Sequence, residues 1–195
     1  MKYLIIQQLS TKNYDYCLVL TPTSEDYSDI LANDLIITPG LRKNNNIILA
    51  TILRRQKSHP RRLLLIFDDC VGSLDFKSKE MNQICTRYQH IGSGTTVIIA
   101  TQYIIQIPQE IRAMCSVGIL FRQNGARAYM EAHNSFGQMG GFNNYKEFAE
   151  YIQTHALQYT CLVVNMRPTS TSRGDIYSVI RVPNPNTLPQ VKFSR

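Results

Sequence analysis

The chain has 195 residues, which is enough for one domain with a sizeable core rather than two domains of ordinary size. Its aliphatic residues are plentiful and no long low-complexity tract interrupts them, so the composition excludes a disordered chain. The 21 Lys and Arg residues against 14 Asp and Glu residues give a formal net charge of +7, which favours an anionic partner such as nucleic acid or nucleotide phosphates.

The cysteines and histidines indicate a reduced protein without a structural metal. Five cysteines stand apart in mostly apolar sequence, as expected of buried thiols in an intracellular protein. The four histidines form no close pair with one another or with a C-x-x-C motif, so no zinc site is predicted. The apolar run at the start ends at Gln7, too short for a signal peptide or a membrane span. We therefore expect a soluble protein with no membrane partner.

The first segments predict a helix, a strand and a second, shorter helix. Residues 1–9 are apolar at helical spacing with no capping residue before them, as in the last part of a helix. Residues 16–20 are apolar and Pro22 follows them, which predicts a buried strand. Acidic residues after Ser24 predict a short helix, and a loop should then reach Gly40.

The next segments lead to the stretch around which the chain is organised. Residues 44–56 have apolar side chains at helical spacing, with basic residues at the end that complement the helix dipole. Residues 63–67 are consecutively apolar and are closed by Asp68 and Asp69, the pattern of a strand buried on both faces of a parallel sheet. Its acidic end has two interpretations. Either the strand stops at a solvated turn, or the carboxylates lie in the crevice where open α/β sheets bind ligands, one holding Mg²⁺ and the other orienting or deprotonating a water, as in the Walker B motif of nucleotide hydrolases.

Strands and helices continue to alternate after this point. Residues 77–88 predict an amphipathic helix. Residues 95–101 are rich in β-branched side chains and predict a buried strand that ends at Gln102. Residues 108–112 have the proline and acid of a short helix, and residues 117–121 predict a fourth strand.

The C-terminal part completes the α/β pattern. Residues 134–144 contain three glycines and predict a loop, either a flexible connection or a place where the backbone approaches a partner such as DNA. Residues 145–156 predict an amphipathic helix, residues 160–164 a fifth strand, and residues 176–182 an edge strand before a loose, proline-containing tail. Short strands alternating with helices predict an α/β fold built on one sheet with right-handed crossovers.

Four motifs taken together resemble one family. In this order and spacing they resemble the FtsK/HerA superfamily of DNA-pumping ATPases, and most closely its viral branch, the genome-packaging ATPases of large eukaryotic DNA viruses and related mobile elements. The segment from Tyr14 to Tyr27 is also similar to the family. The resemblance implies a RecA-like P-loop NTPase core, an α/β fold with a mainly parallel sheet and helices on both faces. The four motifs are Leu63 to Asp69, Thr86 to His90, Val97 to Gln102 and Ile107 to Arg112.

The resemblance also implies roles for particular residues. By that resemblance Asp68 binds Mg²⁺, Asp69 is the catalytic carboxylate and Gln102 is the polar sensor beside the attacking water. Arg87 and Arg112 are candidates for an arginine finger, which the family usually supplies from a neighbouring subunit. The alternatives are a strand-capping amide for Gln102 and solvated helix-end cations for the two arginines.

One departure from the family pattern is large. The sequence contains no G-x-x-x-x-G-K-[ST] loop, which should cradle the phosphates. The segment 92–96 is glycine-rich but has no lysine and precedes a strand, so we interpret it as a turn. Residues 1–9 fall where the family has the rest of its first helix. We therefore expect residues 1–166 to be an ATPase core truncated after its Walker A motif, and residues 167–195 to be a loop, an edge strand and a tail.

Two functions follow from these observations. The first is an ATP-driven DNA translocase that packages a viral or mobile-element genome, with ATP and Mg²⁺ as cofactors, a homo-oligomeric ring around double-stranded DNA, and a place at the viral assembly site or in the virion. The chain as given should then be inactive without a Walker A segment. The second is a non-catalytic nucleic-acid-binding or assembly subunit that keeps the fold. The missing P-loop favours the second, whereas the joint presence of Asp68, Asp69, Gln102 and Arg112 argues against a decayed site.

Overall fold

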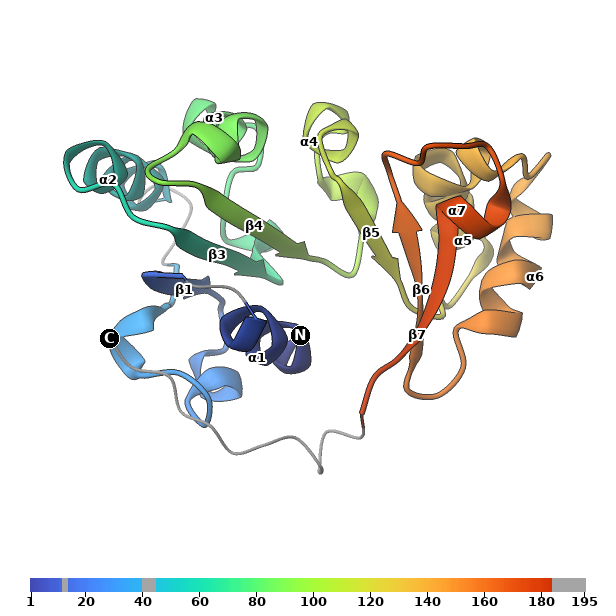
Figure 1. Cartoon of the computed structure of the whole chain (residues 1–195), viewed down its shortest axis with the longest axis horizontal. Helices are drawn as coiled ribbons and strands as arrows, with labels where there is room; N and C mark the ends of the chain where they lie inside the picture. Colours follow the sequence, from blue (N-terminus) through green and yellow to red (C-terminus); the bar gives the residue numbers. More distant parts are fainter. Residues whose placement is uncertain (12–13, 40–44, 184–195) are drawn as a thin grey trace. The chain divides into compact units, whose positions relative to one another are not determined.

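A computed structural model describes residues 1–11, 14–39 and 45–183 of the chain (Figure 1). Within these ranges the chain divides into two compact units. The first comprises Met1–Gln102 and Gln106–Ile111, and the second comprises Tyr103–Ile105 and the residues from Arg112 onward. Among the helices of the described ranges, none has both the length and the apolar character needed to cross a membrane.

A four-stranded parallel sheet is the centre of the first unit. Its spatial order is β2-β1-β3-β4, so β3 has a strand on either side. The first five residues of β3 are buried, which confirms the buried strand predicted from its apolar run. The strands are β1 (Tyr16–Leu20), β2 (Ile36–Ile37), β3 (Leu63–Asp68) and β4 (Thr95–Ala100).

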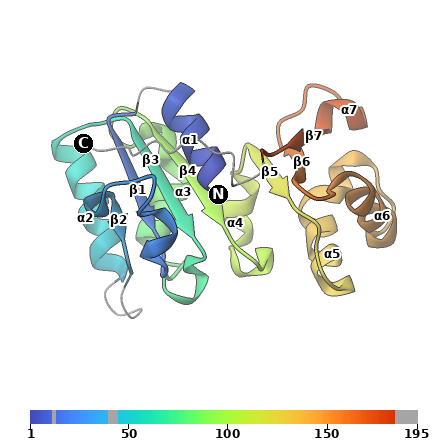
Figure 2. The ribbon, with the colours of Figure 1, turned by 90° about the horizontal axis from the view of Figure 1, so that it is seen from below.

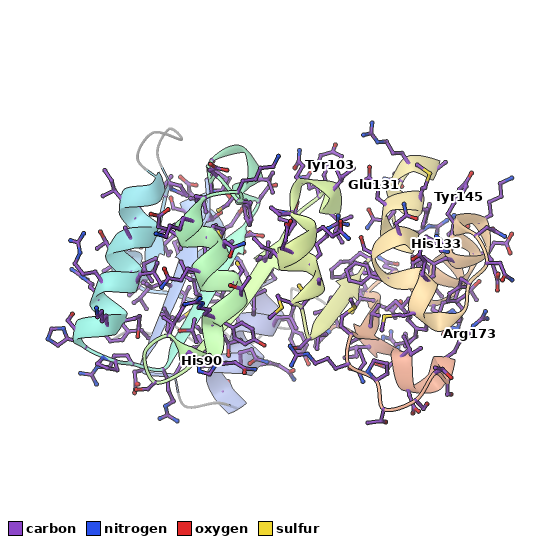
Figure 3. The ribbon with its side chains drawn as sticks, turned by 90° about the horizontal axis from the view of Figure 1, so that it is seen from above. His90, Tyr103, Glu131, His133, Tyr145 and Arg173 are labelled. Atoms are coloured by element: carbon purple, nitrogen blue, oxygen red, sulfur yellow. The ribbon has the colours of Figure 1, made fainter. Side chains whose placement is uncertain are left out.

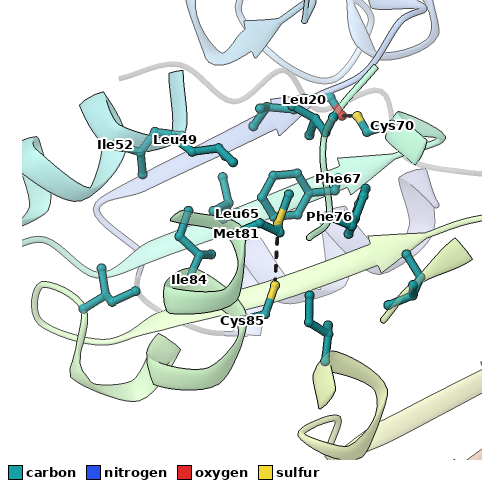
Figure 4. Close-up of a cluster of buried hydrophobic side chains, with 14 of the residues drawn as sticks. Leu20, Leu49, Ile52, Leu65, Phe67, Cys70, Phe76, Met81, Ile84 and Cys85 are labelled. Atoms are coloured by element: carbon teal, nitrogen blue, oxygen red, sulfur yellow. Dashed lines mark hydrogen bonds between the residues drawn. The ribbon is translucent and has the colours of Figure 1, made fainter. Parts of the chain in front are cut away.

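Helices cover both faces of this sheet, as predicted. The helices α2 (Asn45–Ser58) and α3 (Lys79–Arg87) lie on one face and α1 (Lys2–Thr11) lies on the other (Figures 1 and 2). Side chains of β3 alternate between the faces, and Leu65 and Phe67 join the buried cluster under α2 and α3 (Figure 4). Short helical segments connect the main elements: η1 (Ser24–Tyr27), η2 (Asn33–Leu35), η4 (Cys70–Gly72), η5 (Tyr88–His90), η6 (Ile104–Gln106) and α4 (Gln109–Ala113).

The second unit contains a separate antiparallel sheet in the order β5-β6-β7. The expectation that residues 117–121 and 160–164 join the same sheet as the Asp68 strand is therefore wrong. The segment predicted to be an edge strand forms β7, the last strand of this second sheet. The three strands are β5 (Val117–Leu120), β6 (Thr160–Asn165) and β7 (Tyr177–Arg181).

The apolar character of both faces of this sheet explains the wrong prediction. Leu120 and Leu162 are paired across β5 and β6 and are buried in the core of the unit. The opposite face carries Ile119 and Val163, which are half-buried, and Val117, which is 55% exposed. An antiparallel strand with one solvated face normally alternates apolar and polar residues. These strands are apolar on both faces, so their sequences have the pattern of a parallel sheet.

Helices and short helical turns pack on one face of the antiparallel sheet, and their side chains form an aromatic core with Tyr177 of β7. Phe142 and Phe148 have ring centroids 5.0 Å apart, and the Tyr177 ring lies 5.7 Å from Phe142. The Tyr177 hydroxyl donates to the Phe136 carbonyl oxygen at 2.6 Å, so its polar end is satisfied inside the core. These helical elements are α5 (Ala126–Ala132), the π-helix η7 (His133–Gly137), η8 (Gln138–Gly140), α6 (Tyr145–His155) and α7 (Arg173–Ile176).

The segment 134–144, predicted to be a loop, is largely helical, and two of its three glycines serve packing within the chain. Gly137 and Gly140 are both buried. A Cβ atom on Gly140 would lie 2.2 Å from the Tyr177 ring, and one on Gly137 would lie 2.7 Å from the His133 ring. The prediction of a loop was wrong because Gly137 and Gly140 make room for the chain's own aromatic rings.

This packing predicts that Gly140→Ala destabilises the second unit by about 1–3 kcal/mol, as overpacking of a tight core does. The matched control is Gly174→Ala in α7, where the nearest atom to a new Cβ would be the Ser172 hydroxyl at 3.7 Å. Urea unfolding followed by circular dichroism measures both variants. Equal stability of the two variants would contradict the packing role of Gly140.

Candidate active site

The carboxyl edge of the parallel sheet brings together three of the predicted site residues. Asp68 ends β3, and its neighbour in β4 is Ala100. The backbone N–H of Asp69 donates to the Ala100 carbonyl oxygen at 3.1 Å. Gln102 is the second residue after the end of β4, and its Nε2 donates to Asp69 Oδ2 in a long hydrogen bond of 3.5 Å. Two neighbouring parallel strands therefore place a carboxylate and an amide side by side.

Asp69 adopts an unusual backbone conformation at this edge. Its φ of 51° and ψ of 32° lie in the left-handed region, which few non-glycine residues enter. Aspartate tolerates that region better than most residues because its short polar side chain can bond locally. The left-handed turn ends the strand and starts η4, and the Asp69 side chain is exposed. An exposed carboxylate beside an amide can hold and polarise a water molecule.

Asp68 is held by a tyrosine that the sequence interpretation did not assign to the site. The Tyr27 hydroxyl donates to Asp68 Oδ2 at 2.5 Å, and Tyr27 itself is only 2% exposed. Burial, reinforced by the Asp68 carboxylate, raises the pKa of Tyr27. Tyr27 ends η1, the short helix after β1, and β1 runs parallel to β3. The pairing of β1 with β3 was the information needed to bring Tyr27 to this edge.

A buried thiol forms a hydrogen bond between the ends of two strands at the same edge. Cys70 donates from Sγ to the Leu20 carbonyl oxygen at 2.9 Å, which links the ends of β1 and β3. Burial raises the pKa of the Cys70 thiol to about 12. The thiol therefore stays protonated at neutral pH and acts as a small packed donor rather than a nucleophile.

The Tyr27–Asp68 bond predicts that Tyr27→Phe lowers the free energy of unfolding by about 1.5–3 kcal/mol, the range for a hydrogen bond to a charged group. Because the pKa of Tyr27 is raised in the fold, its stabilising contribution is complete below about pH 10, where unfolded tyrosine ionises, and falls as the pH rises above it. The variant should show less of this alkaline loss.

Urea unfolding at neutral and alkaline pH measures both effects of Tyr27→Phe. The control is Tyr129→Phe, since the Tyr129 hydroxyl is buried and has no hydrogen-bond partner in the described structure. Its removal should leave stability unchanged or raise it. Equal losses for the two variants would show that the Asp68 contact is not the cause.

The two arginine candidates lie away from this edge or are already engaged. Arg87 is exposed at the end of α3, before the turn that leads into β4. The start of β4 lies at the amino edge of the sheet, so Arg87 is on the side opposite Asp68 and Asp69. Arg112 belongs to the second unit and donates from a terminal guanidinium nitrogen to the Ser135 hydroxyl at 2.6 Å. Its Nε is buried without a partner in the described residues.

The residues present suit a hard cation but offer no phosphate cradle. Carboxylate oxygens such as those of Asp68 and Asp69 are the ligands that Mg²⁺ prefers, and that ion normally keeps several waters and phosphate oxygens. The described residues contain no cluster of three or more His, Cys, Asp or Glu side chains able to hold a metal alone. A cation here would take its remaining oxygen ligands from water or from the phosphates of a nucleotide. The 195-residue sequence has no G-x-x-x-x-G-K-[ST] motif to hold that nucleotide's phosphates.

Comparison with known proteins defines the fold. No family model and no curated protein matches the sequence. The architecture nevertheless has the fold of P-loop NTPases that package viral genomes. The particular proteins that share it include the genome-packaging NTPase B204 from Sulfolobus turreted icosahedral virus 2 in complex with AMPPCP, with a TM-score of 0.63 and 15% identity over 93% of this chain and 89% of that one. B204, the DNA-packaging ATPase from Sulfolobus turreted icosahedral virus, aligns with a TM-score of 0.64 and 12% identity over 94% of this chain and 89% of that one.

Proposed function

We propose that this chain is the motor subunit of a viral genome-packaging machine and couples Mg²⁺-dependent ATP hydrolysis to the movement of double-stranded DNA. The observation that carries the proposal is the meeting of Asp69 and Gln102 beside Asp68 at the carboxyl edge of a parallel sheet. The fold supports it, because solved structures with this fold are packaging NTPases bound to AMPPCP and ATP-γS. Such a motor acts where viral particles assemble.

The proposal gives each residue of the edge one task. The Asp68 carboxylate holds Mg²⁺ directly or through water, and Tyr27 fixes its orientation. The Asp69 carboxylate orients the attacking water and accepts its proton. The Gln102 amide, which contacts Asp69, positions the same water. Bound ATP would supply the γ-phosphoryl group, and its Mg²⁺ would neutralise the charge that develops on that group.

The arginine finger belongs to the proposed assembly rather than to one subunit. In this proposal copies of the chain form a ring around the duplex, and a cation from one subunit reaches the γ-phosphate bound by the next. Arg112 is the stronger candidate because it closes the segment Ile107 to Arg112, one of the four motifs that resemble the family. Arg87 is the second, since it is exposed at the end of α3. Such a cation stabilises charge on the phosphoryl oxygens.

The sequence also supports a second candidate, a non-catalytic nucleic-acid-binding or assembly subunit. The supporting observation is that the 195 residues contain no Walker A motif. Such a subunit would keep the packing of the sheet and its positive charge without turning over nucleotide.

ATP hydrolysis distinguishes the two candidates. The protein to compare with the 195-residue chain is a P-loop fusion, in which a strand and a G-x-x-x-x-G-K-[ST] loop from a P-loop NTPase lead into α1. We expect negligible turnover by the chain alone, because its sequence has no G-x-x-x-x-G-K-[ST] loop to hold the triphosphate. The fusion should hydrolyse ATP with Mg²⁺ and faster with duplex DNA. A folded fusion that binds ATP but does not hydrolyse it would favour the non-catalytic subunit.

DNA binding by the chain should be sensitive to salt and indifferent to sequence. A protein that contacts Z phosphates loses affinity with a log–log salt slope of about −0.9Z, whereas base readout discriminates by about 1–3 kcal/mol for each good contact. Titration of two unrelated duplexes at two salt concentrations measures both properties. A strong preference for one duplex at equal salt would contradict a motor that moves any sequence.

A further inference from the structure

A dense group of exposed cations lies at the amino edge of the parallel sheet, opposite the carboxyl edge that bears Asp68 and Asp69. Five of them fall within nine residues at the end of α2 and the turn into β3, and the sixth ends α3. All six side chains are exposed. We call this group the basic edge; its members are Arg54, Arg55, Lys57, Arg61, Arg62 and Arg87.

The two segments that carry the basic edge lie against each other. The backbone N–H of Ser93, in the turn after α3, donates to the Arg61 carbonyl oxygen at 3.2 Å. Gly92 has a φ of +62°, and a Cβ there would lie 2.7 Å from that same carbonyl oxygen, so the two turns are in close contact. Figure 3 shows His90, which precedes this turn, at the same end of the unit as the end of α2. The cations therefore form one surface rather than two separate groups.

Little negative charge offsets this surface. The sequence contains no Asp or Glu between Asp34 and Asp68, or between Glu80 and Glu110. The nearby Asp15 accepts from the Arg62 backbone N–H at 2.7 Å. Each ion pair found in the described structure uses other cations, namely Lys2, Arg127 and Arg173.

Helix dipoles do not account for the group. The C-termini of α2 and α3 each carry a charge equivalent to about −0.5, which one cation per helix would satisfy. Six cations exceed that, and cations closer than the Debye length of about 8–10 Å repel one another. A concentration of unpaired charge of this kind is the electrostatic footprint of a polyanion partner.

The composition of the basic edge favours nucleic acid over an anionic membrane. Five of the six cations are arginines, whose planar guanidinium binds phosphate oxygens bidentately. Peripheral membrane binding also needs apolar side chains that enter the headgroup boundary. No large exposed apolar residue of the described structure falls in 54–62 or 87–94.

We propose that the basic edge binds the phosphate backbone of double-stranded DNA, so that the DNA and nucleotide sites lie at opposite edges of one parallel sheet. This inference rests on the proposed function, in which DNA is the partner. β3 begins at the basic edge and ends at Asp68. A shift of β3 would therefore move residues at both the DNA site and the nucleotide site.

The test compares two triple variants with the same loss of charge. Arg54→Gln, Arg61→Gln and Arg62→Gln together form the edge variant. The control variant is Lys79→Gln, Arg122→Gln and Lys146→Gln, which removes three exposed cations outside the basic edge. Circular dichroism and thermal unfolding establish that both variants are folded. Fluorescence anisotropy with a labelled duplex then measures Kd at about 50 and 200 mM salt.

We expect the edge variant to bind at least about tenfold more weakly at the lower salt, and its salt slope to be smaller by about 2.7, which is 0.9 for each of three lost phosphate contacts. The control variant should stay within about twofold of the wild type. Equal affinities for the two variants, with a wild type that binds, would overturn this inference and leave the proposed function standing. A wild type that binds no duplex would overturn both. Loss of binding to phosphatidylserine vesicles without loss of duplex binding would overturn it in favour of a membrane.

Discussion

Asp69→Asn in the P-loop fusion is expected to lower kcat by about 10²–10⁴-fold, the range for loss of a group that accepts a proton in the transition state. The replacement keeps the size of the side chain and can keep the contact with Gln102, so the fold and the affinity for ATP should change little. The loss should therefore appear in kcat rather than in KM. Steady-state ATP hydrolysis with Mg²⁺ and duplex DNA measures it.

A nearby aspartate provides the control for this prediction. Asp75 is also exposed and follows β3, and its Oδ1 accepts from the Lys77 backbone N–H at 2.9 Å. Asp75→Asn makes the same chemical change a few residues away from the edge and should keep kcat within about twofold of the unsubstituted fusion, as a group outside the transition state does. If Asp69→Asn kept the kcat of the unsubstituted fusion, or if Asp75→Asn lost as much activity, the proposed role of Asp69 would be contradicted.

Arg112→Ala in the same fusion is expected to lower kcat by about 10³-fold or more, which is the loss that follows removal of an arginine finger. Nucleotide affinity should be nearly unchanged, because the finger acts on charge that develops in the transition state. Since Arg112 also donates to Ser135, its removal could act through the packing of the second unit instead. Ser135→Ala separates these effects, because it removes the bond and keeps the cation. That variant should retain most of the activity.

Mixed rings test whether Arg112 acts between subunits. An Arg112→Ala subunit mixed with an Asp69→Asn subunit creates some interfaces at which an intact Asp69 faces an intact Arg112 from the neighbour. Partial activity should therefore return. Rings that have exchanged subunits and remain as inactive as either parent would exclude the trans role. The same mixture with Arg87→Ala tests the second candidate.

The elements closest to Asp68 and Asp69 were the most predictable from sequence. The apolar run of β3 specifies a central strand, because burial on both faces leaves few alternatives. The β-branched run of β4 also specifies a strand, but the prediction that this strand is buried was wrong, since most of its residues are half-buried and β4 is the end strand of the described sheet. In a parallel sheet the carboxyl ends of neighbouring strands meet. The proximity of Gln102 to Asp69 therefore followed from two strand predictions and one topological rule.

The features that were missed depend on contacts between distant residues. Tyr27 reaches Asp68 across 41 residues, and no local pattern encodes that bond. The helix α5 (Ala126–Ala132) begins after Gly125 without a side-chain cap, so it has no N-terminal sequence marker. The π-helix that follows is specified by aromatic packing around Gly137 and Gly140 rather than by helical propensity. Tertiary packing decided each of these elements.

The central claim is that the edge formed by Asp68, Asp69 and Gln102 receives the γ-phosphate and Mg²⁺ of ATP. A crystal structure of the P-loop fusion grown with Mg²⁺ and AMPPCP tests it most directly. We predict that the metal lies beside the Asp68 carboxylate and that a water lies between the γ-phosphate and the Asp69 and Gln102 side chains. A structure in which the nucleotide and metal are bound elsewhere, with Asp69 and Gln102 facing only solvent, would contradict the claim.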